Sequence, residues 1–353
     1  MVMRKLIYIQ CILFLFAWHL SAQDQPGEGS INDTIRVNAD LFEQDEPLVF
    51  TMKFDIKAFQ RNKSEGEYMP AELTYHVNDS MEIVKTIRLK ARGNFRRNFC
   101  SMPPFWLNIR KADIENKKLQ EVVKMKVVTH CNGGRASGIY VMKEFLAYQI
   151  YNILSPYSFR ATLVQMKYID TGRKDKVTEN WAFMIEPEEM LIKRLDLFAI
   201  ENDKLSMKLM LPEHMDRVAM FNYMIGNADY SVTGLHNIKI MGLKEINAQG
   251  FIPVPYDFDY SGIVDAFYAE PGENLGIESV TDRYYLGACR EIEEYQSTID
   301  YFNSKKDEIM DLIISFPYLE MKDKKPIIEY IEEFYIQTSY SDFILNDIKR
   351  TCR

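Results

Sequence analysis

The stretch MFNYMIGNADYSVTGLHNIKIMGLKEINAQGFIPVPYDFDYSG, residues 220–262, decides how the chain is organised. It opens with an apolar run that has helical spacing, and Asp229 follows shortly after that run. The pair His236 and Asn237 comes next, at the start of an alternating, strand-like segment. A second apolar segment leads into Asp257, the first residue of Asp-Phe-Asp. We expect the two segments, His236–Met241 and Phe251–Pro255, to form a hairpin that brings Asp257 close to Asn237.

The order Asp, Asn, Asp supplies the residue types that phosphoryl transfer requires. A carboxylate receives the proton of the acceptor hydroxyl, while an Asn and an Asp hold the metal ion that neutralises the nucleotide phosphates. We therefore predict that Asp229 is the catalytic base and that Asn237 and Asp257 bind Mg²⁺ or Mn²⁺. Each motif taken alone also fits a helix cap or a surface turn, so the prediction depends on all three occurring in this order.

Composition sets broad limits on fold and partners. The 353 residues are 47% hydrophobic and 13% aromatic, enough for two ordinary domains or one large domain with two lobes. The formal net charge of -8 argues against nucleic-acid binding, which depends on clustered Lys and Arg.

The first 22 residues have the pattern of a secretory signal peptide. Arg4 and Lys5 precede an apolar run that ends near Trp18, and Ser21 and Ala22 suit a cleavage site. The run is short for a membrane span, and no later segment approaches about 20 apolar residues. We therefore expect an exported protein, periplasmic or secreted, with no transmembrane segment after cleavage.

The rest of the chain divides into a linker and one domain. Residues 23–47 are acidic and have little apolar periodicity, which predicts a linker. Residues 48–353 are expected to form the folded domain, with an N-lobe at about 48–187 and a C-lobe at about 188–353.

Four cysteines remain after cleavage: Cys100, Cys131, Cys289 and Cys352. None forms a Cys-x-x-Cys spacing, which disfavours a zinc knuckle or a thioredoxin-type site. An even number in an oxidising compartment favours disulfides. Four cysteines allow three connectivities. We expect Cys100 to pair with Cys131, because both end neighbouring strand-like segments.

Strand patterns dominate the first half of the chain and helical patterns the second. Strands are predicted at 48–56, 72–77, 83–92, 103–111, 122–130, 161–169 and 181–185, and helices at 138–154, 188–198, 212–225, 290–316 and 321–348. This predicts an α+β fold with a β-rich, mostly antiparallel N-lobe and a mainly helical C-lobe.

A basic turn follows the third predicted strand. Arg92, Arg96 and Arg97 form the densest positive cluster next to a glycine, and guanidinium groups with turn amides suit phosphate oxygens. The alternative is a solvated turn or a set of ion pairs with this acidic protein. The residues alone leave open which of the three arginines would contact a nucleotide.

Kinase chemistry also uses a lysine, oriented by a glutamate, on the nucleotide phosphates. Glu144 on the first long predicted helix is the acidic candidate, and Lys126 on a predicted strand is the lysine candidate, with Lys124 and Arg110 as competitors. A structural ion pair explains such a Lys and Glu equally well.

Several other site classes are disfavoured by missing motifs. The sequence has no Gly-x-Gly-x-x-Gly fingerprint, no Walker A lysine motif and no Gly-x-Ser-x-Gly elbow. Its five histidines show no metal-ligand spacing such as His-x-x-x-His.

The runs RGNFRR, KMKVVTHC, KEFLAYQIYNIL, IGNAD, HNIKI and VPYDFDYSG together resemble the CotH-like secretory protein kinases, and more closely their divergent relatives among exported proteins of Bacteroidetes. The resemblance covers roughly residues 48–290. It implies an atypical protein-kinase-like fold and ATP-dependent phosphorylation of Ser or Thr in exported proteins. By position it makes Asp229 the catalytic Asp, and Asn237 and Asp257 the metal ligands. It also places Arg92 in the family's Arg-Gly motif on the nucleotide side, and Glu144 is a weaker match to the family's helix glutamate. The interval from Asp229 to Asn237 is longer than in familiar protein kinases.

We therefore expect an exported ATP-dependent kinase that modifies another exported protein. Three alternatives remain: a catalytically inactive pseudokinase-type binding or scaffold module of the cell envelope, a metal-dependent phosphoesterase or nucleotidyl-modifying enzyme using the same carboxylates, and a purely structural envelope protein.

Overall fold

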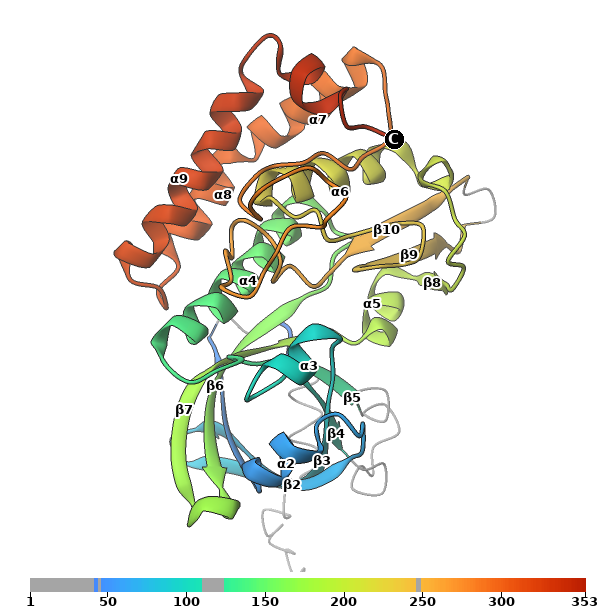
Figure 1. The fold of residues 1–353 in the computed structure, drawn as a ribbon. Helices are drawn as coiled ribbons and strands as arrows, with labels where there is room; N and C mark the ends of the chain where they lie inside the picture. Colours follow the sequence, from blue (N-terminus) through green and yellow to red (C-terminus); the bar gives the residue numbers. More distant parts are fainter. Residues whose placement is uncertain (1–40, 44–45, 110–123, 246–248) are drawn as a thin grey trace, which may run out of the picture.

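The computed structural model describes residues 41–43, 46–109, 124–245 and 249–353. The predicted signal peptide, most of the predicted linker and Arg110 lie outside these ranges. In the described part, a β-barrel forms one half of the molecule and helices with a small sheet form the other (Figure 1).

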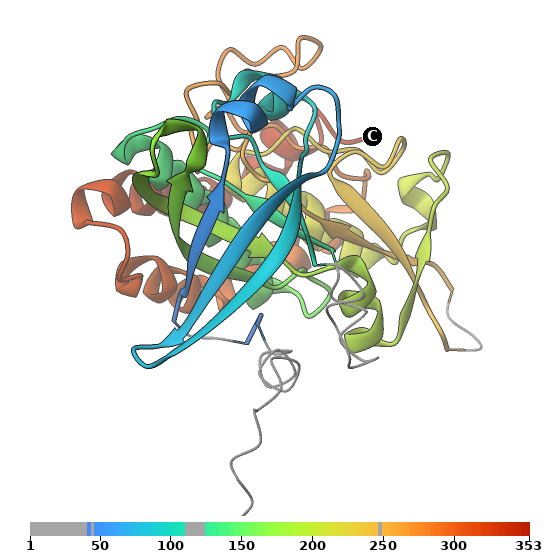
Figure 2. The same cartoon turned by 90° about the horizontal axis from the view of Figure 1, so that it is seen from below.

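Seven strands close into the barrel in the order β1-β2-β3-β4-β5-β7-β6 (Figure 2). Their bounds are β1 Leu48–Phe54, β2 Met69–Asn78, β3 Met81–Ala91, β4 Phe105–Ile109, β5 Lys124–Val128, β6 Ala161–Asp170 and β7 Lys176–Ile185. In β1 the apolar residues Leu48, Phe50 and Met52 alternate with more exposed ones and enter the barrel core. Alternation with period two therefore gives each strand one inward face.

The β-rich half differs from an open sheet because β1 and β6 close it. These strands pair in parallel over all of β1, from Leu48 with Val164 to Phe54 with Asp170. The other neighbouring strands of the barrel pair antiparallel, as the sequence predicts. Closure leaves the barrel without the unpaired edges of an open sheet.

Two short helices accompany the barrel: α2 at Ile56–Asn62 and α3 at Phe95–Phe99. The basic sequence that predicts a turn is therefore a helical turn, α3. A 3₁₀ turn, η4 at Thr171–Arg173, joins β6 to β7.

Helix α4, Arg135–Leu154, connects the two halves. It packs against β6 and β7 of the barrel and against α6 and α8 of the helical half (Figure 1). The sequence places its start at Gly138, three residues later than observed. Burial on several faces explains its high apolar content.

The helical half contains α5 Glu188–Leu195, α6 Pro212–Ile225, α7 Ile292–Ser304, α8 Lys306–Ser315 and α9 Met321–Thr338, with the turns η5 Met207–Leu209 and η6 Ile344–Ile348. Its sheet has the order β10-β9-β8, with β8 Leu197–Ile200, β9 Ile238–Leu243 and β10 Phe251–Pro255. The predicted β9–β10 hairpin is confirmed.

Three predicted helices of this half are wrong in extent. The helix predicted at 321–348 ends at Thr338, and the π-helical turn η6 follows at Ile344–Ile348. The helix predicted at 188–198 ends at Leu195, because Asp196 adopts a left-handed φ of 52° and the chain continues as β8. The helix predicted at 290–316 divides into α7 and α8 at Lys305.

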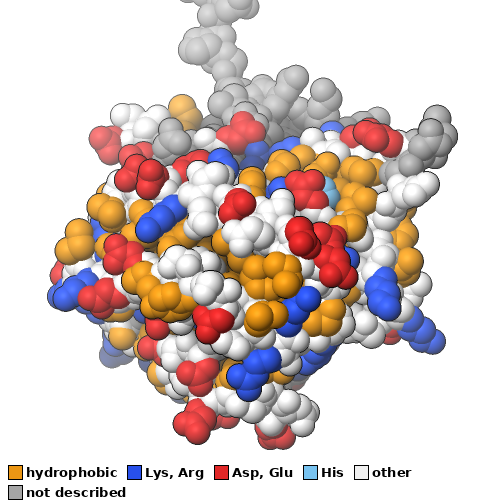
Figure 3. Space-filling model, turned by 90° about the horizontal axis from the view of Figure 1, so that it is seen from above, with side chains coloured by type: hydrophobic (Ala, Val, Ile, Leu, Met, Phe, Trp, Pro, Cys, Tyr) orange, Lys and Arg blue, Asp and Glu red, His pale blue; other side chains and the backbone are white. Residues whose placement is uncertain are grey.

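Two hydrophobic cores result, one inside the barrel and one between the helices and the small sheet. Phe42, which precedes β1, is buried in the barrel core, so packed structure begins ahead of residue 48. Seen from above, the molecule carries hydrophobic side chains scattered among acidic and basic ones (Figure 3). Among the described residues, no helix is long and apolar enough to span a membrane.

Candidate active site

A buried arginine joins three carboxylates where the barrel meets the helical half. Arg96 of α3 is 7% exposed. Its Nη1 lies 3.2 Å from Glu144 Oε2, its Nη2 lies 3.3 Å from Asp257 Oδ1, and its Nε lies 3.2 Å from Asp259 Oδ2. These contacts join α3, α4 and the segment after β10 in one cluster, the Arg96 cluster.

A ring contact and a disulfide hold α3, the short helix that carries Arg96. Phe95 and Phe99 are four residues apart and stack on one side of α3, with ring centroids 4.8 Å apart. Cys100, which ends the helix, is bonded to Cys131. The disulfide holds α3 beside the segment that leads from β5 into α4. The predicted Cys100–Cys131 pair is therefore confirmed, and Cys289 pairs with Cys352.

The Arg96 cluster has more negative than positive groups. Three carboxylates face one guanidinium, and oxygens of the three approach within 4.8 Å of one another. Burial raises the pKa of Glu144 to about 8 against the opposing effect of Arg96. Burial likewise raises the pKa of Asp259 to about 6, and the Tyr268 hydroxyl donates to Asp259 Oδ2 at 3.1 Å.

One buried acceptor of the cluster has no partner. Glu144 is 1% exposed, and its Oε1 makes no hydrogen bond to the described residues. A buried carboxylate oxygen without a donor is costly. The three carboxyl groups supply the oxygen ligands that a divalent cation of the Mg²⁺ or Mn²⁺ type prefers.

Asp257 is held by its backbone as well as by Arg96. Its N–H donates to the hydroxyl of Tyr148 at 2.9 Å. Tyr148 lies one helical turn after Glu144 on α4, so the same helix face positions both parts of the cluster. Asp257 has a φ of 66°, in the left-handed region that is uncommon for non-glycine residues.

Asp229 and Asn237 form a second set of contacts beside Asp257. The Asn237 side-chain amide donates to Asp229 Oδ2 at 2.9 Å and to the Asp229 backbone oxygen at 2.8 Å. His236 Nε2 lies 2.8 Å from Asp229 Oδ1. A turn closed by reciprocal backbone hydrogen bonds between Ser231 and His236 spans the long interval between Asp229 and Asn237.

The hairpin brings Asn237 beside Asp257, as the sequence predicts. Ile238 pairs with Pro255 in the β9–β10 ladder, and the Tyr256 N–H donates to the Asn237 backbone oxygen at 3.0 Å. Asn237 has a φ of 50°, so both predicted metal ligands have left-handed backbones at the same end of the hairpin. The Oδ1 of Asn237 makes no hydrogen bond to the described residues.

Lys126 and Arg92 lie on the barrel side of this site. Lys126 Nζ lies 4.6 Å from the ring centroid of Tyr256, the residue before Asp257. Burial, and next the charge of Arg92, lower the pKa of Lys126 to about 8, while Asp257 acts in the opposite direction. Arg92 lies over Trp106, 5.4 Å from that ring centroid.

One expected pairing is wrong. We expected Glu144 to orient the lysine, but within the described ranges the ion-pair partner of Glu144 is Arg96 and not Lys126. The sequence analysis includes Arg96 in the basic cluster and Asp259 in the Asp-Phe-Asp motif, but it assigns neither residue a role in the site. Tyr148 and Tyr268 carry no sequence signal of this role, since buried tyrosines of a helix and of a loop resemble ordinary core residues.

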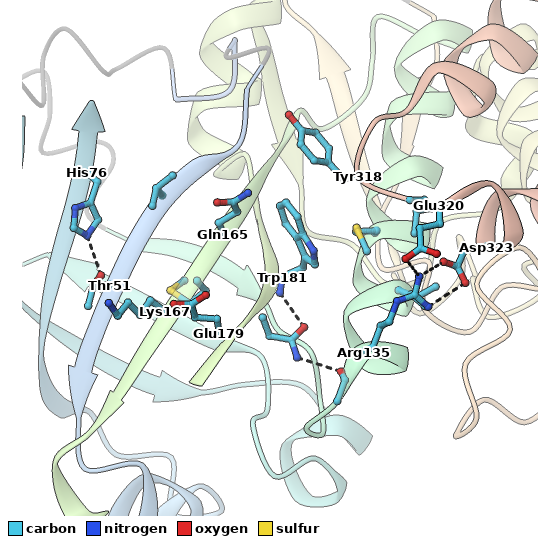
Figure 4. A pocket seen from close by; sticks show the side chains of 17 residues that line it. Thr51, His76, Arg135, Gln165, Lys167, Glu179, Trp181, Tyr318, Glu320 and Asp323 are labelled. Atoms are coloured by element: carbon cyan, nitrogen blue, oxygen red, sulfur yellow. Dashed lines mark hydrogen bonds and ion pairs between the residues drawn. The ribbon is translucent and has the colours of Figure 1, made fainter. Parts of the chain in front are cut away.

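A small cavity adjoins Asp229. It has a volume of about 110 Å³, and its lining includes Asp229, Tyr260 and Glu270. A larger cavity, about 800 Å³, lies elsewhere, between the outer face of the barrel and the start of α9 (Figure 4). There Arg135 bridges to Glu320 and Asp323, and none of the six predicted site residues lines the cavity.

No family model and no curated protein matches the chain. Among solved structures, the crystal structure of the Helicobacter pylori proinflammatory kinase CtkA is similar to it, with 10% sequence identity and a TM-score of 0.37. The similar region covers 67% of this chain and 92% of that chain. A similarity at this level does not assign the fold, and the resemblance to CotH-like kinases stays a prediction.

Proposed function

We propose that the protein is an exported atypical kinase, with a two-lobed kinase-like arrangement, that transfers a phosphoryl group from ATP to Ser or Thr hydroxyls of an exported protein. The observation that carries this proposal is the meeting of Asp229, Asn237 and Asp257 at one end of the β9–β10 hairpin. Lys126 on the barrel side lies against Tyr256, the neighbour of Asp257.

Each residue has a role that its contacts support. Asp229 is partly exposed beside a small cavity, and its Oδ1 and Oδ2 are oriented by His236 and Asn237. It would accept the proton of the acceptor hydroxyl as the oxygen attacks the γ-phosphorus and ADP leaves.

Asp257 and Asn237 would hold Mg²⁺ or Mn²⁺, because Asn237 Oδ1 and the second oxygen of Asp257 remain free of the protein contacts described above. An ion held there would neutralise charge on the phosphates of ATP. Lys126 and Arg92 add positive charge on the barrel side for the phosphates of ATP. Arg96 positions Asp257 and neutralises part of the charge of Glu144 and Asp259.

The two disulfides support export, since such bonds persist in oxidising compartments.

Transfer of labelled phosphate from γ-labelled ATP to a protein acceptor, with Mg²⁺ or Mn²⁺, tests the proposal. Asp229→Asn should lower kcat by roughly 10²–10⁴-fold while ATP binding persists, because only the proton acceptor is removed. Asp203→Asn, an exposed aspartate of the same half, is the matched control and should behave as the wild type. Equal transfer by the wild type and Asp229→Asn would contradict the assignment.

One observation favours a catalytically inactive pseudokinase-type binding module. Arg96 already occupies one oxygen of Asp257, and the Asn237 amide is bonded to Asp229, so the network is satisfied in part by the protein itself. Nucleotide binding that persists with no transfer to any acceptor would favour this alternative.

A further inference from the structure

Exposed aromatic side chains gather beside the candidate active site. The aromatic surface consists of residues from α3, α4 and the loop after β10: Phe95, Phe99, Tyr140, Tyr260 and Phe267. Phe95, Phe99 and Phe267 are 43%, 45% and 57% exposed. Contiguous exposed apolar side chains mark interaction sites more often than isolated ones do.

The rings pack into one continuous layer. The ring centroid of Phe99 lies 5.7 Å from that of Phe267, and the Phe95 centroid lies 6.2 Å from that of Tyr260. Tyr140 of α4 extends the layer, with its centroid 6.0 Å from that of Phe267. The side chains support one another, so their outer faces are held in fixed positions before any partner binds.

The aromatic surface is coupled directly to the site. Phe95 and Phe99 belong to the same helical turn as Arg96, which faces the carboxylates from the other side of α3. Tyr268 is buried beneath the layer and bonds to Asp259. Tyr260 contacts Phe95 and also lines the small cavity beside Asp229. The layer is therefore continuous with the place where an acceptor hydroxyl would approach.

Charge near the aromatic surface bears on the class of partner. The loop that carries Phe267 also carries the exposed acidic residues Asp265, Glu270 and Glu273. Negative charge of this kind opposes approach to an anionic lipid surface, whose binding depends on basic residues. A polypeptide that binds through apolar side chains does not experience this electrostatic repulsion.

We propose that the aromatic surface docks the polypeptide whose Ser or Thr is phosphorylated, by binding an aromatic or aliphatic side chain at a set distance from the acceptor. The inference rests on the proposed function and adds the substrate class: chains with an apolar anchor beside the acceptor. Aromatic anchors on both partners account for much of the affinity at protein interfaces.

Synthetic peptides with one Ser in a Gly-Ala-Gln background, and one Leu or Phe moved through successive positions, test this. With the full exported chain, ATP and Mg²⁺, transfer should favour one spacing, with a KM about tenfold below that of the peptide without the anchor. The variant Phe95→Ser/Phe99→Ser/Phe267→Ser should raise that KM about tenfold and change kcat little, because the reacting groups remain.

The matched control removes three apolar side chains of the helical half that are about as exposed or more so, as Met321→Ser/Ile336→Ser/Leu345→Ser, and should leave KM unchanged. Phe267→Ser alone, the most exposed of the three phenylalanines, should give part of the effect if the triple variant folds poorly.

Failure of the docking proposal is distinguishable from failure of the proposed function. Transfer that is indifferent to the anchor, or equal in the wild type and the triple variant, overturns docking alone. A wild type that neither binds ATP with metal nor transfers phosphate overturns both. Binding to phosphatidylglycerol vesicles, or a dimer, that is lost in the triple variant would assign the surface to lipid or to a second copy and overturn docking.

Discussion

At the scale of single residues, Arg96 is the group on which the candidate site depends. Its guanidinium contacts Glu144, Asp257 and Asp259, which come from two different parts of the chain. Removing one member of a buried charged cluster leaves the other charges without a partner of opposite sign. The loss in the free energy of unfolding then exceeds the net contribution of the intact cluster.

Arg96→Met should therefore lower the free energy of unfolding by about 3–5 kcal/mol in urea denaturation at neutral pH. Arg135→Met is the matched control, since Arg135 also contacts two carboxylates, but at the surface. Exposed pairs contribute little, so this variant should unfold as the wild type does. A similar loss in both variants would contradict a special role for the Arg96 cluster.

Lys126 differs from Arg96, because burying its charge lowers the stability of the folded protein. Burial is the main cause that lowers its pKa to about 8, from the usual lysine value of 10.5. Between these pH values the unfolded chain keeps a proton that the folded chain has lost, so the stability of the wild type rises with pH there.

Lys126→Met should consequently be more stable than the wild type at pH 7, with an advantage that shrinks between about pH 8 and 10.5. The same variant should lose affinity for ATP, because a positive charge near the phosphates is removed. Urea denaturation across this pH range and nucleotide titration measure both effects. A less stable Lys126→Met protein at pH 7 would contradict this account of the lysine.

At the scale of elements, the Cys100–Cys131 bond holds α3 against the segment before α4, and so holds Arg96 near Glu144. The Cys289–Cys352 bond lies in the C-terminal part of the chain and joins no member of the cluster. The two bonds span sequence separations of 31 and 63 residues. Their loops restrict the unfolded chain to a similar degree, about 4 kcal/mol each by loop entropy.

Replacing either pair by serines should lower stability by similar amounts. Only Cys100→Ser/Cys131→Ser should also weaken the binding of ATP with metal, because only that change frees α3. Denaturation and nucleotide titration of the two double variants, side by side, measure this. Equal nucleotide affinity in both variants would contradict a role of the Cys100–Cys131 bond in positioning the site.

The elements also show what the sequence can predict. The β9–β10 hairpin, α6 and the Cys100–Cys131 pair follow from local patterns, since turn residues, helical spacing and strand ends are read within short windows. The closing pair β1–β6 could not be read this way, because it joins residues more than a hundred positions apart by backbone hydrogen bonds that leave no side-chain pattern.

In the candidate site, too, the contacts within one local segment can be predicted from the sequence, and the contacts between distant segments cannot. Asn237 and Asp257 meet because one hairpin carries both, which the sequence shows. Glu144 contacts Arg96 because Arg96 is the buried arginine of α3. The elements that bury it, α4 and the loop after β10, are distant in the sequence. The pattern of three arginines alone leaves that choice open.

At the scale of the whole molecule, the site lies where the barrel and the helical half meet. Helix α4 packs against both of them, against β6 and β7 on one side and against α6 and α8 on the other. A ligand that touches Lys126 on the barrel and Asp257 on the helical half would join the two halves. Such a ligand stabilises the entire folded chain by mass action, by about 2.7 kcal/mol at a hundredfold excess over Kd.

Thermal unfolding with ATP, with Mg²⁺ and with both is the most direct test of a site that binds nucleotide and metal. We expect a rise in Tm that requires nucleotide and metal together, and that is lost in Asp257→Asn but kept in Asp203→Asn. No rise in any combination, or the same rise in Asp257→Asn, would contradict a nucleotide–metal site at the end of the β9–β10 hairpin.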